Sequence, residues 1–271
     1  MNILISNDDG VFAPGILAAK QAVEDLGNVT IVAPDKNNSS VGRRLTLFKH
    51  LKITSCELED KSSAYSVSGS PADCVIVGAK YVMDEKPDLV IVGINSGVNI
   101  SCDITTSGTV CAALEAVSLG IPAIAVSLLI DPTTSYVQDD NGEWHIDYDF
   151  TLAKQVLHDL VLKIMNKGFP DGVDLFNLNV PSTYESKEVK ITHLSHKMLE
   201  KHVIDNRNKK QEEIFNYPLG ENQKSDDLIM ITSDLIREYD EGSDGYALLV
   251  EKCPSLTPLN VNMTFKELKD W

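Results

Sequence analysis

Short, mostly apolar runs alternate with helical segments through the first 130 residues of the chain. Three of these runs cover residues 3–5, 29–32 and 89–94, and each ends at a group of small or polar residues. Between the first two runs, residues 14–26 carry apolar side chains at helical spacing. Strands that are apolar along their length are typical of a parallel sheet covered by helices on both faces. The alternation therefore predicts an α/β fold.

Hydroxyl side chains mark the start of two further helices. Ser70 stands three residues before Asp73, which is the arrangement of a capping box. The sequence SGT at 107–109 opens the second helix, and a strand is expected to follow over residues 121–129.

The chain after residue 130 is less regular. An amphipathic helix is expected over residues 150–165. Short strands are expected over residues 175–180, 189–194 and 246–250. The polar stretch 197–227 is interpreted as a long arm or hairpin, because it lacks the apolar side chains of a core segment.

These differences divide the sequence into two parts. We expect residues 1–130 to form the core unit and residues 131–271 a C-terminal part that ends in a short helix over 265–271.

Acidic side chains outnumber basic ones by 40 to 24, which gives a formal net charge of -16. This excess opposes binding to duplex nucleic acid and to anionic membranes. The apolar run 116–130 is interrupted by Gly120 and Pro122 and is shorter than the roughly 20 residues of a membrane-spanning helix. We therefore expect neither a membrane nor duplex nucleic acid as a partner.

The five cysteines show no CxxC pair, and the chain begins with the strand-like sequence MNILIS in place of a signal peptide. Cysteines in such a chain are interpreted as reduced thiols. The expected location is the cytoplasm.

Polar side chains follow the predicted strands at the point where each strand ends. Asp8 and Asp9 follow the first strand, residues 35–40 the second, and residues 95–99 the third. In a parallel sheet, ligands bind beyond the carboxyl ends of the strands. Adjacent carboxylates repel each other unless a cation or a proton lies between them. Carboxylates with a hydroxyl and a carboxamide would suit Mg²⁺ or Mn²⁺ better than zinc.

A purely structural interpretation of the same carboxylates stays open. Asp8 could cap the following helix and Asp9 could satisfy a turn. The SGT sequence at 107–109 is likewise open to two interpretations. It is either an ordinary helix cap or an anion site formed by hydroxyl groups, amide groups and the positive end of a helix dipole.

Three other nucleotide-linked folds are excluded by the sequence. Gly10 and Gly15 have the spacing of a P-loop, but Ile16 stands where that loop needs lysine. No G-x-G-x-x-G follows the first strand, which argues against a dinucleotide cofactor. The two aspartates are adjacent and not in a D-x-D arrangement, which argues against an aspartyl-phosphate mechanism.

Several stretches of the chain together resemble the SurE family, whose members act as 5′-nucleotidases. They are SNDDG (6–10), APG (13–15), APDKNNS (33–39), SGSPADCV (68–75), PDLVIVGINSGVN (87–99) and TSGTVCAALEA (106–116). The resemblance covers most of residues 1–130 and thins afterwards to FNLNVP at 176–181 and short matches near 245 and 257.

This resemblance implies a Rossmann-like, mostly parallel sheet and one divalent metal ion, Mg²⁺ or Mn²⁺. Its ligands would be Asp8, Asp9, Ser39 and Asn95. The activity implied is hydrolysis of nucleoside 5′-monophosphates, with 3′-nucleotides and short polyphosphate as further candidate substrates.

Roles in catalysis follow from this interpretation. Asp8, Asp9 and Asn95 are the expected catalytic residues. The residues expected at the substrate phosphate are Asn99, Ser107, Gly108 and Thr109. The C-terminal part is expected to serve contacts in a homodimer or a dimer of dimers.

The chain departs from the family pattern after Ser39, where two arginines follow, Arg43 and Arg44. Either arginine could bind the substrate phosphate through paired hydrogen bonds. Alternatively, both face solvent or pair with the abundant acidic side chains.

Two other functions remain as alternatives to hydrolysis. A regulatory protein could bind a nucleotide in the same loops without turnover. A metal-dependent nucleotidyl or glycosyl transferase could also use such a sheet.

Overall fold

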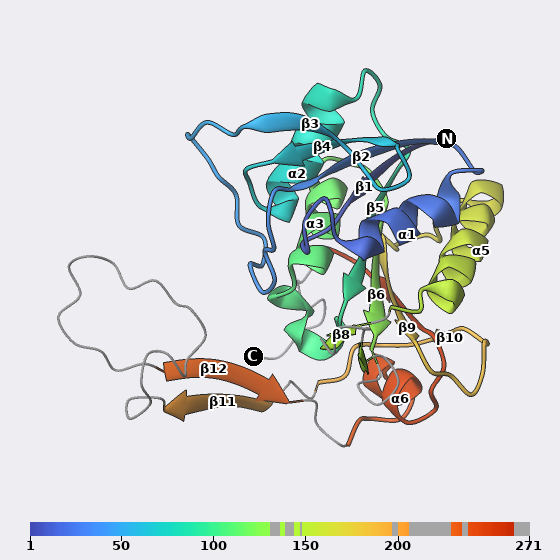
Figure 1. Cartoon of the computed structure of the whole chain (residues 1–271). Coiled ribbons are helices and arrows are strands. Elements are labelled where there is room, and N and C mark those ends of the chain that lie inside the picture. The colour runs from blue at the N-terminus through green and yellow to red at the C-terminus, as the bar shows by residue number, and fades with distance from the viewer. Residues whose placement is uncertain are drawn as a thin grey trace, which may run out of the picture.

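The computed structural model describes residues 1–130, 136–138, 144–146, 148–196, 200–205, 229–234 and 238–262 (Figure 1). Within these residues, nine strands form one sheet in the order β10-β13-β9-β6-β5-β1-β2-β4-β3.

The centre of the sheet is entirely parallel. In chain order its strands are β1 (Asn2–Ser6), β2 (Asn28–Pro34), β4 (Ser63–Val67), β5 (Leu89–Ser96), β6 (Ala123–Leu129) and β9 (Leu175–Pro181). Across the sheet they lie in the order β4-β2-β1-β5-β6-β9. Numbered along the chain, this is the 3-2-1-4-5-6 order of a doubly wound Rossmann sheet. The predicted α/β fold is confirmed.

Shorter strands extend the sheet at both edges. On one side β3 (Ile53–Glu57) pairs antiparallel with β4. On the other, β13 (Ser255–Leu259) pairs antiparallel with β9, and β10 (Lys190–Ile191) pairs parallel with β13. Segments from beyond residue 130 therefore continue the same sheet.

Helices cover both faces of the sheet (Figure 1). Helices α1 (Pro14–Val23) and α5 (Thr151–Lys167) pack on one face over a core that includes Ile5, Ile91 and Leu157. Helices α2 (Pro71–Val77) and α3 (Gly108–Ser118) pack on the other face, over Leu4 and Val90. The side chains of successive residues in one strand thus pack into the cores on opposite faces of the sheet, as expected for a strand that is buried on both faces.

The capping box at Ser70 and the helix start at Ser107 are confirmed. Ser70 accepts a hydrogen bond from the amide of Asp73, whose carboxylate accepts one from the amide of Ser70 in return. Ser107 caps α3 by accepting from the amide of Val110 at 3.1 Å. Short helical turns follow α2 and precede α3, namely η1 (Gly78–Val82) and η2 (Ser101–Thr105).

The prediction of a strand over residues 246–250 is wrong, because this segment belongs to α6 (Asp244–Leu249). Ser243 caps that helix by accepting from the amide of Tyr246. The apolar run is too short for its period to distinguish a strand from a helix. The strand predicted over 189–194 contracts to β10, and the helix predicted over 265–271 lies outside the described residues.

Two strand pairs lie outside the large sheet. Strands β11 (Glu200–Asp205) and β12 (Ile229–Asp234) form an antiparallel pair that projects from the body of the molecule (Figure 1). Within the arm predicted over 197–227, the described residues are those of β11. Strands β7 (Tyr136–Gln138) and β8 (Trp144–Ile146) form the second pair.

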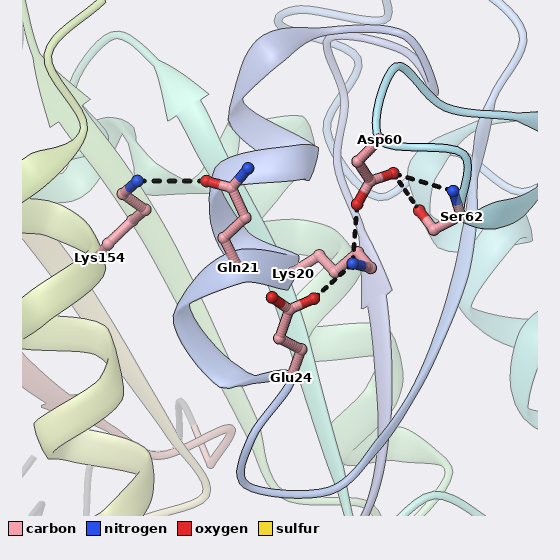
Figure 2. Close-up of polar contacts among 6 residues, drawn as sticks. All are labelled: Lys20, Gln21, Glu24, Asp60, Ser62 and Lys154. Atoms are coloured by element: carbon pink, nitrogen blue, oxygen red, sulfur yellow. Dashed lines mark hydrogen bonds and ion pairs between the residues drawn. The ribbon is translucent and has the colours of Figure 1, made fainter.

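Polar contacts on the surface join α1 to its neighbours (Figure 2). Lys20 pairs with Glu24, which directly follows the same helix, and with Asp60 between β3 and β4, the latter at 2.8 Å. Gln21 accepts a hydrogen bond from Lys154 of α5 at 3.2 Å. Ion pairs near the surface contribute little to stability, so the apolar cores must hold these helices in place.

None of the described helices is both long and apolar enough to cross a bilayer. The five cysteine thiols, all within the described residues, are free of disulfide bonds, in agreement with the sequence-based expectation.

Helix α1 approaches the end of β5 so closely that glycine is required at position 15. A Cβ on Gly15 would lie 1.9 Å from the carbonyl oxygen of Ile94. Because this is a backbone atom, it cannot rotate away as the end of a side chain could.

Gly15→Ala should therefore lower the free energy of unfolding by about 2–3 kcal/mol, the usual cost of overpacking, although alanine favours a helix more than glycine does. Urea denaturation measures this change. Gln21→Ala, at an exposed position of the same helix, is the control and should change stability by less than about 0.5 kcal/mol. A Gly15→Ala protein as stable as the parent would contradict the close approach.

Candidate active site

The turn after β1 places two carboxylates at the centre of one edge of the sheet. This is the point between β1 and β5 where the strand order reverses, and ligands of doubly wound sheets bind there. Asn7 is fully buried and shapes the turn, since its Nδ2 donates to the carbonyl of Gly10 and its Oδ1 accepts from the amide of Gly10. Asp8 and Asp9 are thereby placed at the end of the strand.

Asp8 is only 3% exposed and lies against the first turn of α3. Its Oδ1 accepts a hydrogen bond from the Thr109 hydroxyl at 2.7 Å, and its Oδ2 accepts one from the Thr109 amide at 3.2 Å. A Cβ on Gly108 would lie 2.6 Å from Oδ2 and would displace the carboxylate. The start of α3 therefore fits around Asp8.

Asp9 is held by the loop after β5 and by the loop after β2. Its Oδ2 accepts from the amide of Ser96 at 3.1 Å, and its Oδ1 accepts from Nδ2 of Asn37 at 3.3 Å. No side chain caps the start of α1, where the N-cap residue is Ala13. The interpretation of Asp8 as a cap of this helix is therefore wrong.

Burial raises the pKa of Asp8 to about 6, against the lowering effect of the hydrogen bond from the Thr109 side chain. The adjacent negative charge of Asp9 raises the pKa of Asp8 further. Burial also raises the pKa of Asp9, while hydrogen bonds from Ser96 lower it. Both carboxylates would gain from a positive charge placed between them.

The donor set fits a hard divalent cation. In the described part of the chain, the hydrogen bonds to Asp8 and Asp9 come from neutral amide and hydroxyl groups, so no basic side chain compensates their charge. The described residues contain no cluster of three or more His, Cys, Asp or Glu side chains. A cation here would therefore need neutral oxygen ligands in addition, as Mg²⁺ and Mn²⁺ accept.

A cavity of about 200 Å³ opens beside the carboxylates. Its walls come from the ends of β1 and β5, the loop after β2, and the segment that leads into α3. The lining residues are Asp8, Ser39, Ser40, Asn95, Ser96, Val98, Asn99, Ile100, Asp103, Thr106 and Ser107.

The structure thus brings five of the predicted site residues to one cavity, namely Asp8, Ser39, Asn95, Asn99 and Ser107. Three others do not line the cavity themselves but contact residues that do. Asp9 bonds to Ser96, and Gly108 and Thr109 lie against Asp8. The Thr109 hydroxyl is therefore directed to Asp8 and not to the cavity.

The two arginines lie beside the cavity and do not line it. The Nε of Arg43 is 2.8 Å from a carboxylate oxygen of the buried Glu115 on α3. Arg43 thus pairs with an acidic side chain, as one of the two sequence-based alternatives predicted. Arg44 donates to Oδ1 of Asn38 at 3.3 Å, next to Ser39.

One charged contact at the cavity was not predicted from the sequence. Asp103 lines the cavity and pairs with Lys201 of β11 at 2.7 Å. The buried Asp244 of α6 accepts from the amide of Ser101 in the same segment at 2.8 Å. These pairs are about a hundred residues apart or more, so no local pattern could have indicated them.

The chain is similar to known proteins over most of its length. The family profile described as Survival protein SurE matches residues 3–201. A protein of Methanosphaera stadtmanae named 5′-nucleotidase SurE is 41% identical over 97% of this chain and 96% of its own. A protein of the same name from Methanothermobacter thermautotrophicus is 47% identical over 75% of this chain and 76% of its own.

A solved structure extends the similarity to three dimensions. The crystal structure of the SurE protein from Aquifex aeolicus superposes with a TM-score of 0.73 at 33% identity. The match covers 97% of this chain and 95% of that one. With a family profile over most of the chain and relatives of this identity, the chain belongs to the SurE family.

Proposed function

We propose that the protein hydrolyses nucleoside 5′-monophosphates to a nucleoside and inorganic phosphate, assisted by one divalent cation. The observation that carries this proposal is the pair of partly or fully buried carboxylates, Asp8 and Asp9, at the edge of a small polar cavity where the strand order reverses. The name 5′-nucleotidase, borne by relatives that align with nearly the whole chain, supports the substrate class.

Asp8, Asp9, Ser39 and Asn95 would hold the cation, which we propose to be Mg²⁺ or Mn²⁺. When bound, such an ion polarises a phosphoryl oxygen and offsets the negative charge that develops during hydrolysis. The protein's part is to keep both carboxylates fixed and ionised. Thr109 does so for Asp8 and Ser96 for Asp9.

The substrate phosphate would lie against the start of α3. The hydroxyl of Ser107 and the amide of Gly108 can donate hydrogen bonds there, at the positive end of the helix dipole. Asn99 would add a carboxamide from the opposite wall. Water attacks phosphorus, the bond to the 5′ oxygen breaks, and that oxygen takes up a proton to become the nucleoside hydroxyl. Arg44, beside the Ser39 loop, remains a candidate for a further phosphate contact.

Other substrates and activities make different products. 3′-Nucleotides and short polyphosphate would also release phosphate, so substrates must be compared side by side. A transferase would need an acceptor, and a nucleotide-binding regulator would release no phosphate with any divalent metal. The deciding experiment is phosphate release from purine and pyrimidine 5′-monophosphates, without an acceptor, across divalent metals.

Removing the metal should abolish activity. Excess chelator should stop phosphate release, and Mg²⁺ or Mn²⁺ should restore it. Asp9→Asn should raise the metal concentration needed for half-maximal rate by about tenfold or more, because a charged ligand becomes neutral. Colorimetric phosphate measurement over a metal titration gives both the rate and the metal concentration at half-maximal rate.

Asp84→Asn is the matched control, because it removes the same charge at an exposed position that precedes β5, at the opposite end of that strand. Its titration curve should stay within about twofold of the parent. Full activity in excess chelator, with metal removal verified, would refute the proposed dependence on a divalent cation.

Stability of the metal-free protein should fall as the pH rises from about 4 to about 6. Folded Asp8 keeps its proton up to a pKa of about 6, whereas an unfolded aspartate loses it near pH 4. The folded state therefore binds more protons over this range, and raising the pH costs it about 3 kcal/mol of unfolding free energy. Urea unfolding in chelator at several pH values measures this loss, which Asp8→Asn should largely remove. If the unfolding free energy of the parent and of Asp8→Asn fell equally with rising pH, the raised pKa of Asp8 would be contradicted.

We further propose that residues 1–130 form the catalytic core and that residues 131–271 serve oligomer contacts, in a protein that works in the cytoplasm. Val203 and Ile231 support the contact role. They face each other across β11 and β12 and are 66% and 74% exposed, which is unusual for an apolar cross-strand pair.

Light scattering at micromolar concentration should give the mass of a homodimer or a dimer of dimers. Replacing Val203 and Ile231 together by serine should shift the mass downwards. Tyr81→Ser, at a position 78% exposed in η1, is the control and should leave the mass unchanged. A monomeric parent protein would refute the proposal.

A further inference from the structure

Two asparagines of β9 are fully buried in a strand whose other residues are all apolar. Asn177 and Asn179 are both 0% exposed, and they alternate with Phe176, Leu178 and Val180 of the core under α5. They lie in the FNLNVP stretch, to which the proposed chemistry assigns no role. Burying a carboxamide is costly unless it is hydrogen-bonded, so its partners indicate why it is there.

Both side chains bond to one residue of the cavity wall, Asn99. The amide of Asn99 donates to Oδ1 of Asn179 at 2.9 Å. The carbonyl of Asn99 accepts from Nδ2 of Asn179 at 2.9 Å and from Nδ2 of Asn177 at 2.8 Å. The two asparagines therefore fix both backbone polar groups of Asn99, about 80 residues away in the sequence.

The side chain of Asn99 is fixed from the same surface. Its Nδ2 donates to the hydroxyl of Ser127 at 2.8 Å, and Ser127 of β6 stands opposite Asn179 in the sheet. Asn99 lines the cavity together with Asp8 and Asn95. Sheet and loop thus hold this carboxamide at a defined place in the cavity.

Neighbouring polar residues on the next strand offer a contrast. Ser255 and Thr257 lie opposite Asn179 and Asn177 on β13 and are equally buried, yet both bond to Thr192, which directly follows β10. Their partners lie away from the cavity. The direction of the two asparagines towards Asn99 is therefore not a general property of this polar part of the sheet.

We propose that Asn177 and Asn179 are positioning residues of the hydrolytic site, which act by orienting Asn99 towards the substrate phosphate. This inference rests on the proposed phosphatase activity. Small displacements of a group that contacts the reacting phosphate can lower the rate by about a hundredfold.

Asn177→Leu and Asn179→Asp test the proposal. The first removes one hydrogen bond to the Asn99 carbonyl, and the second keeps the shape and the acceptor but replaces the donor. Each should lower kcat for a nucleoside 5′-monophosphate by about tenfold or more, with a smaller change in KM. Thermal unfolding verifies that each variant is folded.

Thr257→Val is the matched control, since it removes a buried hydrogen bond opposite Asn177 without touching Asn99. It should lower the melting temperature by a similar amount and leave kcat within about twofold of the parent. If kcat falls equally in the control, the effect is one of general stability and the proposal is wrong.

A double-mutant cycle then tests whether the effect passes through Asn99. In an Asn99→Ala background, Asn177→Leu should have almost no further effect on kcat, because the group that it positions is gone. Additive losses would overturn the proposal.

Hydrogen exchange tests, without measuring turnover, whether the side chain of Asn179 holds the backbone of Asn99. The Asn99 amide should exchange faster in Asn179→Asp than in Thr257→Val, and equal protection would overturn the proposal. A parent protein that releases no phosphate would refute the proposed function itself. An active parent whose Asn177→Leu variant has the parental kcat would refute only the positioning role.

Discussion

The contact between Asp8 and the first turn of α3 is the interaction on which the rest of the site depends. It joins the end of β1 to a helix that begins a hundred residues later in the chain. A carboxylate that is 3% exposed needs hydrogen bonds to remain in place, and Thr109 provides two. Gly108 leaves the space for it, because any side chain there would strike the carboxylate. The hydrogen bonds from Thr109 and the space left at Gly108 thus both keep the buried Asp8 carboxylate in place.

A second layer of polar groups supports the opposite wall of the cavity. Strands β6 and β9 are buried on both faces, and most of their side chains belong to the apolar cores. Ser127, Asn177 and Asn179 interrupt this pattern, and all three bond to Asn99. The sheet therefore does more than carry loops on its edge. Through these side chains it fixes the conformation of a loop whose own residues are partly exposed.

Much of the fold was predictable because its signals are local. Ser70 was identified as a cap from the residues next to it, the helix start at Ser107 was predicted in the same way, and both form as expected. The order of apolar strands and helices indicated a parallel sheet, and the topology of the sheet confirms it. The error at residues 246–250 has a local cause as well. Five apolar residues in a row carry no period, and the helix is defined by the cap at Ser243 instead.

The sequence by itself determined that Asp8, Asn95 and Ser107 lie at the same edge of the sheet, because the carboxyl ends of parallel strands and the helix starts that follow them must meet there. Only the tertiary structure decided which groups hold them. That Thr109 turns to Asp8, or that Asn179 reaches Asn99, depends on contacts of about 3 Å between segments 80 or more residues apart. Such contacts follow from how the layers pack against each other, and no local pattern of residues encodes them.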